Sequence, residues 1–114
     1  MAERRHARRY EVYLPLQVCT SKKRPSEFHT AQLRDISRSG LYYHTSVAAE
    51  PGSTLELTFA LPTEKERGSS VLVRASARVL RVAEVERDVT PIYGVAAAID
   101  RIDFVRPVAA TVAA

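Results

Sequence analysis

Short runs in which apolar and polar residues alternate constrain the fold of this chain more than any other feature. The clearest run places Leu55, Leu57, Phe59 and Leu61 on one face, with polar or small residues between them. A period of two residues is typical of a strand that buries one face. Runs of this kind, together with short apolar and aromatic runs, predict strands at residues 10–18, 28–34, 41–45, 54–61, 71–82 and 92–99. Turn residues separate the runs and helical periodicity is almost absent, so the sequence predicts an all-β fold, a six-stranded antiparallel barrel.

Two irregularities within these runs predict departures from regular strand pairing. Pro15 lies inside the first run and cannot donate a hydrogen bond to a ladder, which indicates an edge position or a bulge. In the fifth run the alternation slips, so that Leu80 and Val82 become the apolar positions and Arg81 lies outside. This slip predicts a bulge near residue 79 or 80 that bends a long strand around the barrel, before a turn at residues 84–88.

The two ends of the chain lie outside the strand pattern. Residues 1–9 contain four arginines and no apolar periodicity, so they are expected to form a flexible, arginine-rich arm. The barrel is expected to span residues 10–106. Residues 107–114 are expected to form a short helix, because Pro107 suits a first helical turn, or a frayed tail.

Positive charge is concentrated in the first third of the 114-residue chain, whose net charge is +4. Residues 1–40 hold nine Lys and Arg against four Asp and Glu, and the remainder holds eight against nine. This excess favours an anionic partner, although a solvated basic tail has the same composition. A single cysteine, Cys19, excludes an intramolecular disulfide, and neither a signal peptide nor a membrane-spanning run is present. A soluble, cytoplasmic protein is therefore expected.

The residues that commonly perform catalysis or bind metals do not form a known pattern here. His6, His29 and His44 lack metal-ligand spacing, and no nucleophile elbow or phosphate-binding glycine loop is present. Residues 35–40 imitate the start of a calcium loop, but its twelfth position is Ser46 instead of a glutamate. No enzymatic activity, cofactor or metal is predicted.

The stretch Asp35-Ile36-Ser37-Arg38-Ser39-Gly40 joins the second and third predicted strands. In an ordinary turn, the Asp and Ser side chains would bond nearby backbone N–H groups and Gly40 would adopt a positive φ. A turn alone does not explain why an acid, a hydroxyl and a glycine occur at spacings of two and three in a chain that also carries an arginine-rich arm.

In combination, these motifs resemble the PilZ domain family, whose members are bacterial receptors for the second messenger cyclic di-GMP. The resemblance is carried by Arg4-Arg5-x-x-x-Arg9, by Val12-x-Leu14-Pro15 and by Asp35-x-Ser37-x-x-Gly40. The six-strand pattern also fits the family, and Tyr93-Gly94-Val95 is similar to its last, glycine-bearing strand. Ala97 departs from the family, which commonly has a bulky aromatic residue there. The resemblance implies a PilZ-type barrel over most of the chain.

The resemblance also implies which residues bind the ligand. The primary candidates are Arg4, Arg5, Arg9, Asp35, Ser37 and Gly40, and the secondary candidates are Arg8, Arg38 and Ser39. Two arginine registers are open, Arg4 with Arg8 and Arg5 with Arg9; the position of the first strand favours the second. Family members with an additional preceding arginine tend to bind the ligand as an intercalated dimer, and Arg4 implies the same here.

The chemistry of these residues suits the ligand. A guanidinium can fork onto phosphate oxygens or the O6/N7 edge of guanine and can stack on its face. Asp35 can accept from the guanine N1–H and N2–H groups, Ser37 can bond a phosphate or the guanine amine, and Gly40 allows close backbone approach. We expect the arm to be mobile when free and to wrap over the bound ligand, which would present a changed surface to an unidentified downstream protein.

Two other functions remain open from the sequence. The first is a PilZ-type protein-interaction module that does not depend on cyclic di-GMP. The second is a small barrel that binds single-stranded nucleic acid through its basic arm, with Tyr42 and Tyr43 as stacking platforms.

Overall fold

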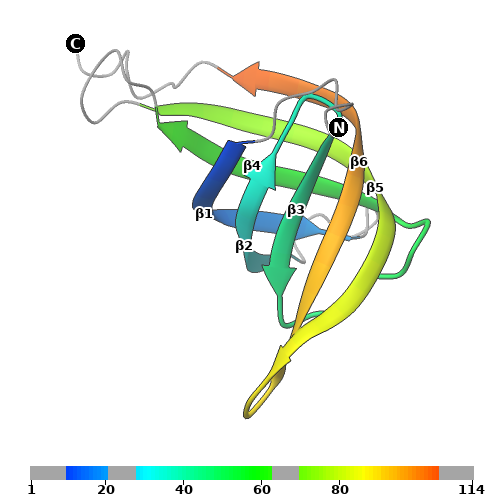
Figure 1. Cartoon of the computed structure of the whole chain (residues 1–114). Helices are drawn as coiled ribbons and strands as arrows, with labels where there is room; N and C mark the ends of the chain where they lie inside the picture. The colour runs from blue at the N-terminus through cyan, green and yellow to red at the C-terminus, as the bar shows by residue number, and fades with distance from the viewer. Residues whose placement is uncertain (1–9, 21–27, 63–69, 106–114) are drawn as a thin grey trace, which may run out of the picture.

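The computed structural model describes residues 10–20, 28–62 and 70–105, and in these ranges the regular structure consists of strands alone. The six strands are β1 (Tyr10–Cys19), β2 (His29–Ile36), β3 (Gly40–Thr45), β4 (Thr54–Pro62), β5 (Ser70–Arg87) and β6 (Pro91–Val105). All neighbours pair antiparallel and form a closed barrel in the order β1-β2-β3-β6-β5-β4 (Figure 1). The predicted fold class is confirmed. The predictions for residues 1–9 and 107–114 lie outside the described residues.

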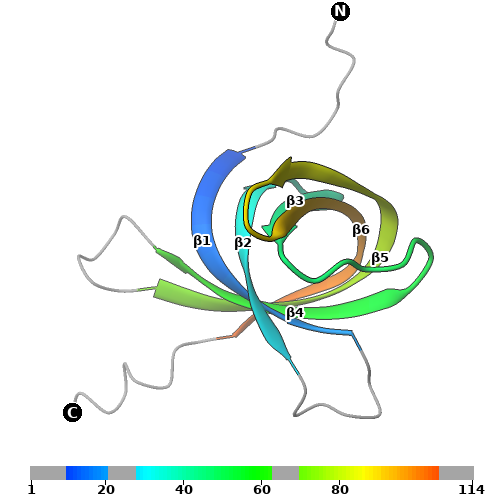
Figure 2. The same cartoon turned by 90° about the horizontal axis from the view of Figure 1, so that it is seen from below.

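The barrel closes through a short contact between β1 and β4. Only residues 17–19 of β1 pair with β4, after β1 has curved around the barrel (Figure 2). Pro15 precedes this contact and pairs with Gln32 of β2 alone, and the β1–β2 register shifts between Glu11 and Leu14. The predicted edge position of Pro15 is therefore confirmed, since β1 has one neighbouring strand at that point.

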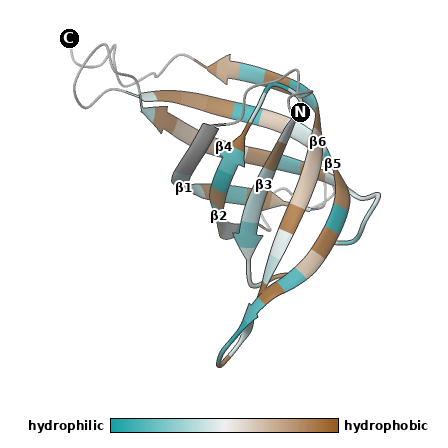
Figure 3. Cartoon of the chain, in the orientation of Figure 1, coloured by the Kyte–Doolittle hydropathy of each residue, from teal (hydrophilic) through white to brown (hydrophobic). Residues whose placement is uncertain are grey.

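The core is built from the inward residues of all six strands. The largest side chains that are less than 2% exposed are Leu16, Val18, Leu33, Tyr43, Leu55, Leu57, Val73, Val79 and Val95. Apolar and polar residues alternate along the strands accordingly (Figure 3). Each buried aliphatic side chain contributes about 1.5–3 kcal/mol through the hydrophobic effect. Ala97 is buried between its register partners Leu41 and Val79, so this small side chain also belongs to the core.

Strand β5 contains the predicted bulge. Val79 pairs with Ala97 and Arg81 pairs with Ala96, so Leu80 is the inserted residue. The prediction that Leu80 faces inward is wrong: its side chain is 53% exposed. A bulge places two residues opposite one, and here both Leu80 and Arg81 lie on the outer side before Val82 returns to the core.

Several strand ends differ from the predictions. Strand β5 continues to Arg87, so the turn predicted at residues 84–88 occurs at residues 88–90, and the β5–β6 hairpin projects beyond the barrel (Figure 1). Strand β6 continues past residue 99 to Val105, because its last residues pair with the first half of β5. This pairing tolerates charged residues, since their side chains are exposed. Asp35 and Gly40 belong to the ends of β2 and β3.

Candidate ligand pocket

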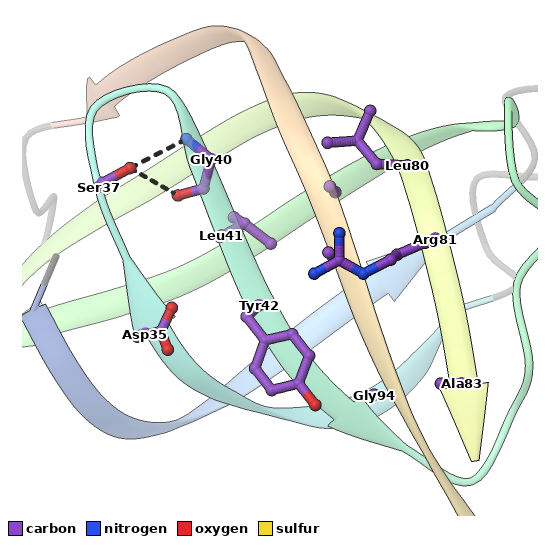
Figure 4. Close-up of a pocket in the computed structure, with 11 residues that line it drawn as sticks. Asp35, Ser37, Gly40, Leu41, Tyr42, Leu80, Arg81, Ala83 and Gly94 are labelled. Atoms are coloured by element: carbon purple, nitrogen blue, oxygen red, sulfur yellow. Dashed lines mark hydrogen bonds between the residues drawn. The ribbon is translucent and has the colours of Figure 1, made fainter. Parts of the chain in front are cut away.

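The connection between β2 and β3 is closed around Ser37. The backbone N–H of Ser37 donates to the carbonyl of Gly40 over 2.8 Å. The Ser37 Oγ accepts from the N–H groups of Ser39 and Gly40 at 3.3 and 3.2 Å, and its hydroxyl lies 3.3 Å from the Gly40 carbonyl (Figure 4). The local hydrogen bonding expected of a serine in a turn is thus confirmed for Ser37.

The structure explains glycine at position 40 by close strand packing instead of by the positive φ expected of a turn. Among the described residues, only Gly52 has a positive φ, of 90°, so the positive φ predicted for Gly40 is wrong. A Cβ atom on Gly40 would lie 3.1 Å from the carbonyl oxygen of Ala97 in β6. Glycine therefore allows β3 to begin close to β6.

A row of register partners crosses four strands beside this turn. Asp35 of β2 pairs with Tyr42 of β3, Tyr42 pairs with Ala96 of β6, and Ala96 pairs with Arg81 of β5. Paired residues point to the same face of a sheet, which here is the outer face of the barrel. Adjacent strands lie about 4.8 Å apart, so the row is about 14 Å long when measured along the curved sheet. An acid and an arginine thus flank an aromatic ring and a methyl group.

Small side chains make this face hollow. In the neighbouring row, Gly94 of β6 pairs with His44 and Ala83, so the surface beside Tyr42 is formed by Gly94, Ala83 and Ala96. A pocket of about 520 Å³ lies here. Its lining residues are Asp35, Ser37, Gly40, Leu41, Tyr42, Leu80, Arg81, Ala83, Gly94, Ala96 and Ala97 (Figure 4).

The Tyr42 ring lies across the pocket toward β6. A Cβ atom on Gly94 would lie 2.8 Å from Cζ and 3.0 Å from Cε1 of Tyr42, so the phenolic end of the ring fills the space that a larger residue would need. Tyr42 also contacts His44 edge to face, with ring centroids 5.3 Å apart and an interplanar angle of 78°. The ring therefore has two neighbours, Gly94 and His44, which form a register pair beside it.

His44 is in turn held by Arg34, which lies at a register shift in β2. The Arg34 Nη1 is 2.9 Å from Nδ1 of His44, and the guanidinium carbon lies 4.6 Å from the ring centroid of Tyr13. Burial lowers the pKa of His44, the charge of Arg34 lowers it further, and Glu86 opposes them. His44 is thus favoured as a neutral ring that accepts the hydrogen bond from Arg34 at Nδ1.

Two charged side chains of the pocket are available to a ligand. Asp35 is half-buried and Arg81 is exposed, and within the described residues neither has a hydrogen bond or an ion pair. The pocket therefore offers a carboxylate acceptor, a guanidinium donor and an aromatic ring. In the same ranges, no group of three or more His, Cys, Asp or Glu side chains is placed to hold a metal ion. No helix there has the length and hydrophobicity needed to cross a membrane.

The structure brings together part of the predicted site. Asp35, Ser37 and Gly40 line one pocket, whereas Arg38 and Ser39 are exposed in the turn and are not among its lining residues. The four predicted arginines, Arg4, Arg5, Arg8 and Arg9, lie outside the described residues.

Among the further residues that line this pocket are two polar side chains that the sequence patterns do not assign to it. In the sequence, Tyr42 suggests only a platform for nucleic acid, and Arg81 only an outward residue after the bulge. Their nearness to Asp35 follows from pairing between distant strands, which no local pattern reveals. The small residues of the sixth strand are the available signal, because they leave room on the outer face.

The fold is a small closed barrel with a polar pocket beside the β2–β3 turn. A family model described as the PilZ domain matches residues 3–106, nearly the whole chain. The chain therefore belongs to the PilZ domain family, a family of cyclic di-GMP receptor domains, and the resemblance inferred from the sequence is confirmed.

One solved structure with a similar fold is that of the Bacillus subtilis inhibitor of motility (MotI/DgrA). It matches with a TM-score of 0.68 and 17% sequence identity over 89% of this chain. The match covers 44% of that protein, so this chain spans less than half of its length. A comparison with curated proteins finds no match.

Proposed function

We propose that this chain is a receptor domain for cyclic di-GMP and that its outer pocket receives a guanine of the ligand. The observation that carries the proposal is that Asp35, Ser37 and Gly40 line one pocket on a barrel of the PilZ family. A receptor needs binding groups and no catalytic group, so the proposed role is non-enzymatic. With a single cysteine in the chain, a reducing, cytoplasmic setting is part of the proposal.

Asp35 is the proposed base-selecting residue. A carboxylate only accepts hydrogen bonds, and guanine presents N1–H and N2–H donors side by side. Adenine has an acceptor at N1 and no amino group at position 2, so it would leave the half-buried carboxylate without its partners. A charged hydrogen bond of this kind contributes about 1.5–3 kcal/mol. Asp35 should therefore favour guanine over adenine.

Arg81 is proposed as a second ligand contact. Its guanidinium lines the same pocket and extends from β5 across β6 toward Tyr42 (Figure 4). A guanidinium can form paired hydrogen bonds to guanine O6 and N7 or to phosphate oxygens. Arg81 thus supplies positive charge opposite Asp35, on the side of the pocket away from the β2–β3 turn.

The arginines of residues 1–9 are proposed to bind the phosphates and the second base. The register supports this role, because Tyr10 and Glu11 at the start of β1 pair with Ile36 and Asp35. The chain thus enters the barrel beside Asp35. We propose that Arg5 and Arg9, with Arg4 and Arg8 nearby, order on the ligand, that an intercalated ligand dimer is bound, and that a downstream protein binds the changed surface.

Isothermal titration calorimetry tests this function. The wild type should bind cyclic di-GMP saturably, and cyclic di-AMP and a single-stranded oligonucleotide should bind much more weakly. Asp35→Asn should weaken binding of cyclic di-GMP about 10- to 150-fold, while the control Asp103→Asn, at the far end of β6, should bind normally. Absence of wild-type binding would leave a protein-interaction module as the better explanation. Tight binding to the oligonucleotide with little base preference would instead indicate a nucleic-acid-binding barrel.

A further inference from the structure

We propose that the ring of Tyr42 is a stacking platform for a guanine base of the ligand, held in its binding orientation by Gly94 and His44. The inference rests on the proposed function and adds an aromatic contact to the polar contacts of the pocket. Stacking binds any planar base, so Tyr42 would provide affinity while Asp35 provides the choice of base.

The orientation of the ring is the first observation behind this inference. Figure 4 shows Tyr42 with its ring nearly face-on to the viewer, between Asp35 and Gly94, and with the hydroxyl directed toward β6. The side chain lies over the glycine instead of extending into solvent. A ring that lies along the outer surface of a sheet presents one face to a ligand.

The support of the ring is the second observation. The backbone at Gly94 lies beneath the phenolic end, and His44 contacts the ring at 5.3 Å between centroids. His44 is itself fixed by the 2.9 Å hydrogen bond with Arg34. A ring that is already ordered loses little conformational freedom when a base binds, so more of the stacking energy contributes to affinity.

The groups on either side of the ring are the third observation. Asp35 and Arg81 belong to the same cross-strand row as Tyr42, so they stand on opposite sides of the ring on one face of the barrel. Guanine carries its N1–H and N2–H donors on a different edge from its O6 and N7 acceptors. A base stacked on Tyr42 can therefore turn its donors toward Asp35 and its acceptors toward Arg81.

Other described aromatic residues do not offer this combination. Tyr42 is the one aromatic residue among those that line the pocket. Tyr43 is 1% exposed and points into the core, which excludes it as a platform. The ring of Tyr13 already lies against the Arg34 guanidinium.

Ring-replacing variants and calorimetry with cyclic di-GMP test the inference. Tyr42→Phe keeps the ring and should bind within about twofold of the wild type. Tyr42→Leu keeps apolar bulk but removes the ring, and should weaken binding about 5- to 150-fold, the range found for removing one stacked base contact. The matched control is Phe104→Leu, which replaces an exposed aromatic residue outside the pocket and should bind normally.

A measurement on the wild type keeps the test independent of how the variants fold. NMR of the wild-type complex should show intermolecular NOEs between a guanine H8 proton and the ring protons of Tyr42, because stacking brings the two rings into contact. Normal binding by Tyr42→Leu, or the absence of such NOEs in the wild-type complex at saturation, would overturn the stacking inference alone. Failure of the wild type to bind cyclic di-GMP would overturn the proposed function and the inference together.

Discussion

The phenolic end of Tyr42 occupies the space above Gly94 in which any other residue would place its Cβ atom, with Cζ 2.8 Å from that position. Tyr42 pairs directly with Ala96, so Gly94 is its diagonal neighbour on β6. An aromatic ring that covers a cross-strand glycine is a recognised way to stabilise a sheet at a position without a side chain. The same pair shapes one side of the pocket.

Gly94→Ala should therefore destabilise the barrel and displace Tyr42. An added methyl group at a filled position costs about 1–3 kcal/mol in unfolding free energy. Urea denaturation of the wild type, Gly94→Ala, Tyr42→Ala and the double variant forms a double-mutant cycle, which measures the coupling between the two residues. The double variant should lose less stability than the sum of the single losses, since Tyr42→Ala removes the clash. Additive losses would mean that the two side chains do not compete for this space.

Ser37→Ala should lower both stability and ligand affinity. Its Oγ bonds the N–H groups of Ser39 and Gly40, so the substitution should cost about 0.5–1.5 kcal/mol in unfolding free energy. Ser53→Ala is a matched control, because the Ser53 hydroxyl also closes a turn, by donating to the Glu50 carbonyl over 2.6 Å, but lies outside the pocket. Thermal unfolding and calorimetry should reveal a stability loss in both variants and an affinity loss in Ser37→Ala alone. If Ser37→Ala and Ser53→Ala bind the ligand with equal affinity, Ser37 does not contribute to ligand binding.

Arg81→Ala should weaken cyclic di-GMP binding about 5- to 150-fold, as expected for the loss of a bidentate contact worth about 1–3 kcal/mol. Arg81→Lys should recover only part of the affinity, since an ammonium group cannot form the paired hydrogen bonds of a guanidinium. Arg74→Ala provides the control: Arg74 is exposed on the same strand but lies outside the pocket. Titration of all three variants at one salt concentration makes the comparison, and an equal loss for Arg74→Ala would indicate a general charge effect.

The pH dependence of stability should contain a contribution from His44. Its pKa is lowered in the folded protein by burial and by Arg34, with Glu86 opposing, so the unfolded state binds the proton more readily. The contribution of His44 to stability should be fully present above pH 6.5, its ordinary pKa, and should be lost as the pH drops through its lower pKa in the folded protein. The difference between the urea midpoints at pH 8 and pH 5 should be smaller for His44→Gln than for the wild type. Because burial also lowers the pKa of His29, part of the acid loss should persist in the variant.

The sequence predicted the strands well where one face is buried. Leu55, Leu57 and Phe59 alternate with less buried neighbours, and a period of two leaves a single choice of inner face. It predicted the ends of β5 and β6 less well. The β5–β6 register shifts at three places, and the exposed, charged residues at the end of β6 have no alternation that marks a strand.

The residues of the candidate site also differ in how far the sequence predicts them. Asp35, Ser37 and Gly40 are close in sequence and form a local motif, so sequence patterns are enough to propose them as one site. Tyr42 and Arg81 join them through pairing of β3 with β6 and of β6 with β5, after a bulge at Leu80. A register error of one residue would turn either side chain to the other face, so local patterns cannot assign them to the pocket.

An amide NMR titration of the full chain with cyclic di-GMP tests the central claim most directly. The account predicts saturable shifts at Asp35, Ser37, Gly40 and Tyr42, at the facing residues Arg81 and Gly94, and in residues 4–9. Resonances of Thr58, Arg74 and Asp103, whose backbones pair on another part of the barrel, should stay unchanged. Saturable shifts centred on these three residues, or no shifts anywhere at saturating ligand, would contradict the claim that the outer pocket beside the β2–β3 turn is a cyclic di-GMP site.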